Sequence, residues 1–191
     1  LMLRLAKAGT DHRKYLRMMQ VGVRITAPLY FYKELDTYKV GTVCNSCSTM
    51  HKIQAKEFTL DDFSCEHLVD GCSSSSQGVY EDVGVPDGEE YIYYAPKDIL
   101  EEWIIPSLNN CRNMFLKTKN KVWWWQMIQL LPSSYNQTRN YTFTYENLIN
   151  MYFARRNHKL DEWREFCKWM LDNVPYFKEL VEHIQGFKKI S

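Results

Sequence analysis

Apolar residues recur at helical spacing throughout the C-terminal half of this 191-residue chain, and this periodicity constrains the fold more than any other feature. Five of them follow the i, i+3, i+4, i+7, i+8 pattern of an amphipathic helix: Tyr145, Leu148, Ile149, Tyr152 and Phe153. Thr144 precedes this stripe and is a good N-cap residue. The same spacing recurs in residues 163–171, and Tyr176, Phe177, Leu180 and Ile184 indicate one more short helix. We therefore expect helices from Lys97 onward, with their apolar faces buried in a core.

The N-terminal part of the sequence predicts a helix, a strand and a second helix. Residues 3–20 read as a helix that is interrupted before Asp11, which can cap its second segment. Residues 21–26 place apolar side chains at alternate positions, which is typical of a half-buried strand. Pro28 cannot donate a backbone hydrogen bond and should end the strand. Residues 29–35 are expected to form a short helix.

The size and charge of the chain favour one domain without a strong electrostatic partner. We expect a single domain over residues 1–191, with an irregular excursion at about 56–96 that holds a run of serines at 73–76 and a short strand at 91–94. The 24 basic and 23 acidic residues give a net charge of +1, which excludes strong attraction to nucleic acids or anionic membranes. The longest apolar run, 122–131, is too short to span a bilayer. Six cysteines and no signal-peptide pattern lead us to expect a cytoplasmic protein.

Cysteines form one weak metal-binding pattern. Cys44 and Cys47 make a CxxC pair, whereas Cys65 and Cys72 are separated by six residues. A zinc knuckle usually needs two tight CxxC pairs, so ordinary thiols are the better explanation. We assign no metal site.

The stretch from residue 36 to residue 51 is rich in hydroxyls, amides and small side chains, unlike a core helix or strand. Lys39 can serve as a point charge for a phosphate, and Gly41 lets the backbone turn or approach a ligand closely. Four further residues could orient a polar ligand: Asn45, Ser46, Ser48 and Thr49. An ordinary polar loop with caps and turns would use the same residues. Composition alone favours the loop.

The polar face of the helix expected after Thr144 is a second place where a ligand could bind. Four residues form this stripe: Asn147, Asn150, Ala154 and His158. Asparagines are costly to bury without partners. Arg155 and Arg156 close the C-terminal end, where basic residues also complement the helix dipole. A solvated face and a ligand-facing wall would each explain the pattern.

Taken together, these segments resemble the flavin-dependent thymidylate synthases, the ThyX family. Ile25-Thr-Ala-Pro28 is similar to the strand end that precedes the family's Arg-His-Arg-x7-Ser motif, and Asn45-x-x-Ser48 matches the asparagine and serine of that motif. Leu130-Leu131-Pro132 looks like the family's Val-Leu-Pro. Asn150-Met-Tyr-Phe-Ala-Arg155, followed by Glu162-Trp163, is similar to its C-terminal Asn-Phe-Leu-x-Leu-Arg and Ala-Gln-x-Glu. The resemblance covers most of the chain outside roughly 56–96.

The resemblance implies an α+β fold of the ThyX type, with an antiparallel sheet core and a helical C-terminal half. It implies that a pyrimidine deoxynucleotide is held by Lys39, Asn45, Ser46, Ser48, Thr49 and Arg155, with Arg156 as the alternative arginine. Asn150 and His158 would contact the cofactor. FAD, NADPH and methylenetetrahydrofolate would then serve the methylation of dUMP to dTMP. Family sites lie between subunits, so we expect a homo-oligomer, most simply a homotetramer. No catalytic residue is assigned.

The sequence departs from the family at two places that matter for chemistry. Tyr38-Lys39-Val40 stands where the family has Arg-His-Arg, and lysine lacks the planar bidentate geometry of arginine. Glu146 falls near an arginine that serves the flavin, and a carboxylate would repel a diphosphate. Two interpretations follow: a ThyX-like enzyme with an altered site, or a catalytically inactive binding protein, for instance one encoded by a phage, that sequesters a nucleotide or blocks another protein. We expect weak FAD binding and little conversion of dUMP to dTMP.

Overall fold

The structure, a computed structural model, describes residues 1–69 and 95–188. They form two compact units, which we name the sheet unit (residues 1–47 and the part from 137 onward) and the hairpin unit (residues 48–136). Each is described by itself. The serine run at 73–76 and the strand expected at 91–94 lie outside the described residues. The single domain with an excursion at about 56–96 stays a prediction.

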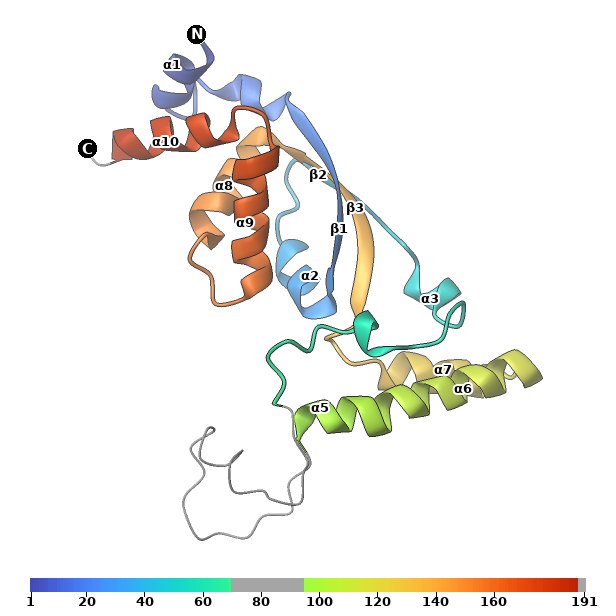
Figure 1. Ribbon diagram of the computed structural model, residues 1–191. Coiled ribbons are helices and arrows are strands. Elements are labelled where there is room, and N and C mark those ends of the chain that lie inside the picture. Colours follow the sequence, from blue (N-terminus) through green and yellow to red (C-terminus); the bar gives the residue numbers. More distant parts are fainter. Residues whose placement is uncertain (70–94, 189–191) are drawn as a thin grey trace, which may run out of the picture. The chain divides into compact units, whose positions relative to one another are not determined.

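A three-stranded antiparallel sheet forms the middle of the sheet unit (Figure 1). Its strands are β1 (Gln20–Pro28), β2 (Thr42–Ser46) and β3 (Asn136–Thr144), in the order β1-β3-β2. The expected antiparallel sheet is therefore confirmed. The prediction that the whole region from Lys97 onward is helical is wrong, because β3 lies within it. The last strand in sequence, β3, is the central one. Its Tyr141 and Phe143 alternate with β-branched threonines, which is a strand pattern.

The prediction of a polar loop over residues 36–51 is wrong for residues 42–46, which form the strand β2. Four of its five residues are exposed because it lies at the edge of the sheet. An edge strand needs no apolar alternation, so its sequence resembles that of a polar loop. Residues in β2 pair with β3 in a register that places Asn45 opposite Asn140.

Helices cover one face of this sheet (Figure 1). They are α1 (Met2–Lys7), the 3-10 turn η1 (Lys14–Arg17), α2 (Leu29–Leu35), α8 (Tyr145–Arg155), α9 (Asp161–Asn173) and α10 (Phe177–Lys188). The core between the helices and the sheet is largely aromatic: Trp163 is fully buried with its ring centroid 4.9 Å from that of Phe31, and Phe143 of β3 lies 6.1 Å from Phe166.

Most expected helices of the sheet unit are present, with one correction. The helix expected over residues 3–20 is reduced to α1 and η1, and η1 is preceded by Arg13 without a side-chain cap, so Asp11 caps nothing there. Thr144 caps α8 as expected, because its hydroxyl accepts a hydrogen bond from the backbone N–H of Asn147 at 3.2 Å.

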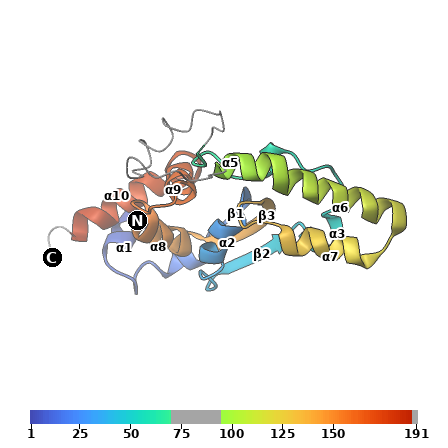
Figure 2. The ribbon, with the colours of Figure 1, turned by 90° about the horizontal axis from the view of Figure 1, so that it is seen from below.

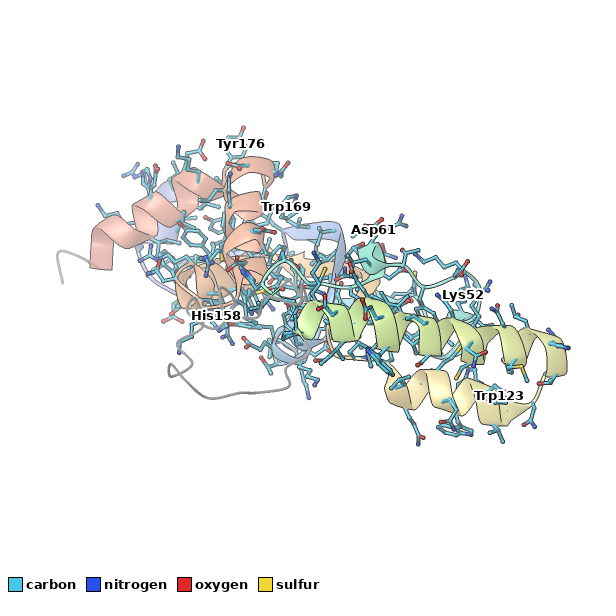
Figure 3. All side chains as sticks on the ribbon, turned by 60° about the horizontal axis from the view of Figure 1, so that its bottom comes forward. Lys52, Asp61, Trp123, His158, Trp169 and Tyr176 are labelled. Atoms are coloured by element: carbon cyan, nitrogen blue, oxygen red, sulfur yellow. The ribbon has the colours of Figure 1, made fainter. Side chains whose placement is uncertain are left out.

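The hairpin unit is built around two helices that lie side by side (Figure 2). Its elements are α3 (Thr49–Lys52), η2 (Leu60–Asp62), α5 (Pro96–Asp98), the π-helix η3 (Ile99–Ile104), α6 (Ile105–Thr118) and α7 (Lys121–Leu130). Lys119 turns the chain between α6 and α7 with a left-handed φ of 55°, and Asn120 caps α7. Figure 3 shows Trp123 on α7.

Part of the segment expected to be irregular belongs to the core of the hairpin unit. Phe58 and Phe63 are each 4% exposed, and both rings pack near Tyr135. Phe63 also forms an antiparallel bridge with Tyr135. Among the described residues, no helix has the length and apolar character needed to cross a membrane.

Candidate functional site

A pocket of about 360 Å³ lies in the sheet unit, between the loop of residues 37–41 and the first turns of α8. We name it the α8 pocket. Its lining residues are Arg17, Thr37, Tyr38, Lys39, Val40, Gly41, Thr144, Glu146, Asn147 and Asn150. Two residues of the sequence-based site, Lys39 and Asn150, are therefore brought together here.

The loop side of the pocket is shaped by Gly41. This glycine has a φ of +70°, and its carbonyl accepts a hydrogen bond from the backbone N–H of Thr144 at 3.2 Å. A Cβ at residue 41 would lie only 3.1 Å from Cγ2 and Oγ1 of Thr144. This close approach lets the backbone of the 37–41 loop hydrogen-bond to Thr144, the N-cap residue of α8. The two walls of the pocket, the loop and α8, are therefore joined directly.

Arg17 is the functional candidate that the sequence did not indicate. It ends η1, and the chain that follows is tied to α8 because the N–H of Tyr145 donates to the carbonyl of Met19 at 3.0 Å. This long-range hydrogen bond carries the end of η1 to the pocket. No spacing pattern in the sequence could have shown it.

Two buried acceptor atoms on adjacent residues of α8 have no hydrogen-bond partner within residues 1–69 and 95–188. Glu146 and Asn147 are 9% and 8% exposed. Oε1 of Glu146 accepts from Nε and NH2 of Arg13 at 3.2 and 3.0 Å, whereas Oε2 has no hydrogen-bond partner among the residues that the structure describes. Nδ2 of Asn147 donates to the carbonyl of Val40 and to Oγ1 of Thr42, whereas Oδ1 has no hydrogen-bond partner in the described part of the chain. Such atoms are unfavourable unless something donates to them.

The positive charges of the pocket lie on exposed side chains. Lys39 and Arg17 are both exposed, and within the part of the chain that the structure describes neither forms an ion pair. The pocket therefore has two accessible cations, whereas the unpartnered oxygens of Glu146 and Asn147 are buried. Two exposed cations suit a small ligand that carries an anionic group.

Arg155 and His158 meet in a different cluster, which is centred on Glu34. Oε2 of Glu34 lies 2.9 Å from NH1 of Arg155, 3.1 Å from Nε1 of Trp163 and 3.3 Å from Nε2 of His158. Nε of Arg155 also donates to the hydroxyl of Tyr38 at 3.0 Å. Since Tyr38 lines the α8 pocket, Arg155 contacts the pocket wall but already has Glu34 as its counter-charge.

His158 is not on the helical stripe that the sequence suggested. α8 ends at Arg155, and His158 lies in the turn before α9 (Figure 3). Its Nδ1 accepts a hydrogen bond from the N–H of Leu160 at 3.2 Å, so the proton of the neutral ring sits on Nε2 and points to Glu34. Of the predicted polar stripe, Asn147, Asn150 and Ala154 therefore lie on α8, and His158 does not.

The remaining residues of the sequence-based site lie elsewhere. Asn45 and Ser46 are neighbours on β2, so their side chains point to opposite faces of the sheet. Asn45 pairs across the sheet with Asn140, whose Oδ1 accepts from Nε of Arg24 at 3.1 Å. Ser48 and Thr49 start α3 and belong to the hairpin unit. The guanidinium of Arg156 lies 5.4 Å from the ring centroid of Phe153, on the aromatic surface of α8.

The cysteines show no metal site in the described ranges. Within residues 1–69 and 95–188, no three His, Cys, Asp or Glu side chains are grouped so that they could hold an ion, and Cys72 lies outside these ranges. Cys44 and Cys47 are exposed. Burial raises the pKa of the Cys167 thiol to about 11, so this thiol stays protonated at neutral pH.

Comparison with known proteins supports a relationship at the level of the fold. No protein-family model matches the sequence, and no curated protein matches it. A crystal structure of thymidylate synthase X (ThyX) from Helicobacter pylori with FAD and dUMP aligns with 96% of this chain and 94% of its own, at 13% identity and a TM-score of 0.54. A second structure of the flavin-dependent enzyme from that organism, complexed with FAD and dUMP, aligns over 99% and 95% at 14% identity and a TM-score of 0.51.

A UMP/dUMP methylase, PolB from Streptomyces cacaoi bound with 5-Br UMP, aligns over 99% of this chain and 88% of its own, at 12% identity and a TM-score of 0.45. At identities this low, the two ThyX structures bear on architecture and not on activity. The chain has a mixed α/β fold, with a three-stranded antiparallel sheet and a helical C-terminal half, that is structurally similar to ThyX.

Proposed function

We propose that the α8 pocket binds a pyrimidine deoxynucleoside monophosphate. The observation that carries the proposal is the meeting of Lys39 and Asn150, two residues implied by the ThyX resemblance, with Arg17 in one pocket of a ThyX-like fold. The similar structures from Helicobacter pylori contain dUMP, which makes nucleotides of this class the first ligands to consider.

In this proposal, the exposed cations at the pocket bind the phosphate. Lys39 and Arg17 can each donate charge-assisted hydrogen bonds to phosphate oxygens. Tyr38 supplies an aromatic wall for the base, and its orientation is set by the hydrogen bond from Arg155 and by the ring of Trp163, 5.8 Å away. Arg155 is then a positioning residue and not the primary phosphate ligand.

FAD fits the residues of this pocket poorly. Ligand pockets span about 300–1,000 Å³, and the α8 pocket, at about 360 Å³, is close to the lower bound. FAD joins a flavin and an adenine nucleotide through a diphosphate, so it needs more space than a single nucleotide. Glu146 adds a carboxylate to the lining, and a carboxylate cannot donate a hydrogen bond to a phosphate oxygen. The ion pair with Arg13 weakens the repulsion between this carboxylate and a diphosphate.

We therefore favour a binding protein that retains a nucleotide site, over an enzyme that methylates dUMP with FAD, NADPH and methylenetetrahydrofolate. In the cell such a protein would sequester the nucleotide or use it as a signal for binding another protein. The enzyme remains the second candidate, because the fold is similar to that of enzymes solved with FAD.

Calorimetric titration with dUMP tests the proposal. Lys39→Ala and Arg17→Ala should each weaken binding by about tenfold or more, because a hydrogen bond to a charged group contributes about 1.5–3 kcal/mol. Lys33→Ala is the matched control, since Lys33 is an exposed lysine of α2 outside the pocket, and it should leave the affinity unchanged. Arg155→Ala, which acts only through Tyr38, should weaken binding by less than tenfold.

Two results would contradict this conclusion. Wild-type affinity in both Lys39→Ala and Arg17→Ala would show that the nucleotide binds elsewhere. A purified protein with a stoichiometric flavin absorbance band, which forms dTMP from dUMP with methylenetetrahydrofolate and NADPH, would establish the enzyme instead.

A further inference from the structure

We infer that the buried ion pair between Arg13 and Glu146 positions Arg17 at the α8 pocket and thereby sets how tightly the pocket binds a phosphate. The inference rests on the proposed nucleotide site, and it adds two residues that act through Arg17 and not by contact with the ligand. Nε and NH2 of Arg13 both donate to Oε1 of Glu146, at 3.2 and 3.0 Å.

The 3-10 turn η1 is joined to α8 on both sides of Arg17. Arg13 immediately precedes η1, and it is bonded to Glu146, the second residue of α8. Two residues after Arg17, the carbonyl of Met19 accepts a hydrogen bond at 3.0 Å from the N–H of Tyr145, the first residue of α8. The turn that carries Arg17 is therefore bonded at both ends to the start of the helix that lines the pocket.

Arg17 depends on this attachment for its place in the pocket. Its side chain is exposed, and in the described ranges it forms no ion pair that could orient it. Leu16, the preceding residue, is fully buried and holds η1 against the core. Apolar contact is non-directional, however, and a single 3-10 turn has few hydrogen bonds of its own. The hydrogen bonds of Arg13 and Met19 therefore fix the orientation of the turn, and with it the position from which Arg17 extends.

The burial of the ion pair points to positioning more than to stability. The side chains of Arg13 and Glu146 are only 11% and 12% exposed. Removing two charges from water offsets much of their attraction, so a buried pair often adds little net stability, while its geometry can still favour one arrangement. Apolar side chains of similar volume should therefore replace the pair without loss of stability, but they would not define the position of η1.

The sign of the effect distinguishes positioning from direct electrostatics. Glu146 also lines the α8 pocket, where a carboxylate acting on its own would repel a phosphate. Neutralising it would then strengthen nucleotide binding. If Glu146 acts through Arg13 and Arg17 instead, neutralising it should weaken binding, because Arg17 is no longer held toward the phosphate.

The main test replaces the pair by Arg13→Met with Glu146→Leu, which leaves the net charge of the protein unchanged. Calorimetric titration with dUMP should show a loss of affinity of about tenfold, close to the loss expected for Arg17→Ala. The matched background is Arg17→Ala, in which the same two substitutions should change the affinity by less than about twofold. The urea denaturation midpoint should stay at or above that of the wild-type protein.

Glu146→Gln is a milder variant that keeps the shape of the side chain. It tests the inference even if the double variant does not fold, which circular dichroism would show. Glutamine can still accept from Arg13, but the hydrogen bond is weaker because the acceptor carries no charge. Binding of dUMP should therefore weaken by about threefold. Tighter binding would overturn the inference, since Glu146 would then act as a simple negative charge.

Hydrogen exchange gives a measurement that needs no nucleotide. In the double variant the amide of Tyr145 should exchange several times faster than in the wild-type protein, because its hydrogen bond to Met19 opens more often when η1 is loosely held. The amide of Phe58, which donates to Oδ1 of Asn109 in the hairpin unit, is the internal control and should exchange at an unchanged rate.

The outcomes separate the two proposals. Wild-type affinity in the double variant would overturn the inference and leave the nucleotide site standing, and so would an equal loss of affinity with and without Arg17. If the wild-type protein bound no dUMP, the proposed function would fail and the link to phosphate binding with it, whereas exchange at Tyr145 would still show whether the pair holds η1. A loss of affinity that disappears in the Arg17→Ala background, at unchanged stability, would support both.

Discussion

At Gly41 the backbone has a φ of +70°, which an L-residue with a Cβ adopts at a cost of about 1–2 kcal/mol. The contact of an added Cβ with Thr144 at 3.1 Å would be tighter than ordinary van der Waals packing. Thr144 cannot move away easily because its hydroxyl caps α8. Strain at this single residue therefore affects both walls of the α8 pocket.

Gly41→Ala should lower the free energy of unfolding by about 1–3 kcal/mol and weaken nucleotide binding, since the 37–41 loop must shift. Urea denaturation and calorimetry measure the two effects. Gly22→Ala is the matched control, because nothing lies within 4 Å of a Cβ built at that position in β1, and it should change stability by less than about 0.5 kcal/mol. Equal losses in both variants would argue against a special role for Gly41.

At the scale of elements, α6 holds the segment before η2 through one asparagine side chain. Nδ2 of Asn109 donates to the carbonyl of Phe58 at 2.9 Å, and Oδ1 accepts from the N–H of Phe58 at 2.8 Å. The amide thus satisfies both backbone groups of a residue that is 4% exposed and belongs to no helix or strand. Irregular backbone can be buried only when its polar groups find such partners.

Asn109→Ala should lower the stability of the hairpin unit by about 2–4 kcal/mol, because two buried backbone groups lose their partners. Hydrogen exchange should show faster exchange of the Phe58 amide, together with a lower denaturation midpoint. Asn110→Ala, at the next residue and exposed, is the control and should change little. Unchanged exchange at Phe58 in Asn109→Ala would mean that water replaces the side chain.

For the whole molecule, self-association stays a prediction, and α7 is the surface on which to test it. Val122 and Trp125 of α7 are 55% and 47% exposed, and Leu116 at the end of α6 is 38% exposed. Residues 105–131 contain four basic residues and no acidic one, so this surface is apolar and weakly positive. Exposed aromatic and aliphatic side chains are typical of subunit interfaces.

Light scattering should show a species several times heavier than the 22.8 kDa chain, and Trp125→Glu should shift it toward the monomer, because burying an unpaired carboxylate at an interface is unfavourable. Met18→Glu, at an 85% exposed apolar residue of the sheet unit, is the control and should leave the mass unchanged. If the wild-type protein were monomeric at micromolar concentration with dUMP present, the prediction of a homotetramer would be wrong.

The elements that could be predicted are those whose signal is local. α8 and α9 follow from apolar residues at helical spacing, the cap at Thr144 follows from residue type, and β1 follows from alternation ended by Pro28. The expected antiparallel sheet with a helical C-terminal half is also observed. Each of these depends on side chains a few residues apart, whose periodicity the sequence displays directly.

What only the tertiary structure decided is which distant segments meet. β2 reads as a loop because an edge strand is solvated, and β3 becomes the central strand by pairing with β1 and β2, which precede it by more than 90 residues. The hydrogen bond between Tyr145 and Met19 brings the end of η1, with Arg17, to the α8 pocket, and Arg155 forms an ion pair with Glu34, which precedes it by more than 100 residues. Such pairings arise from burial and hydrogen bonding between distant segments, so they cannot be predicted from residue types at short spacing.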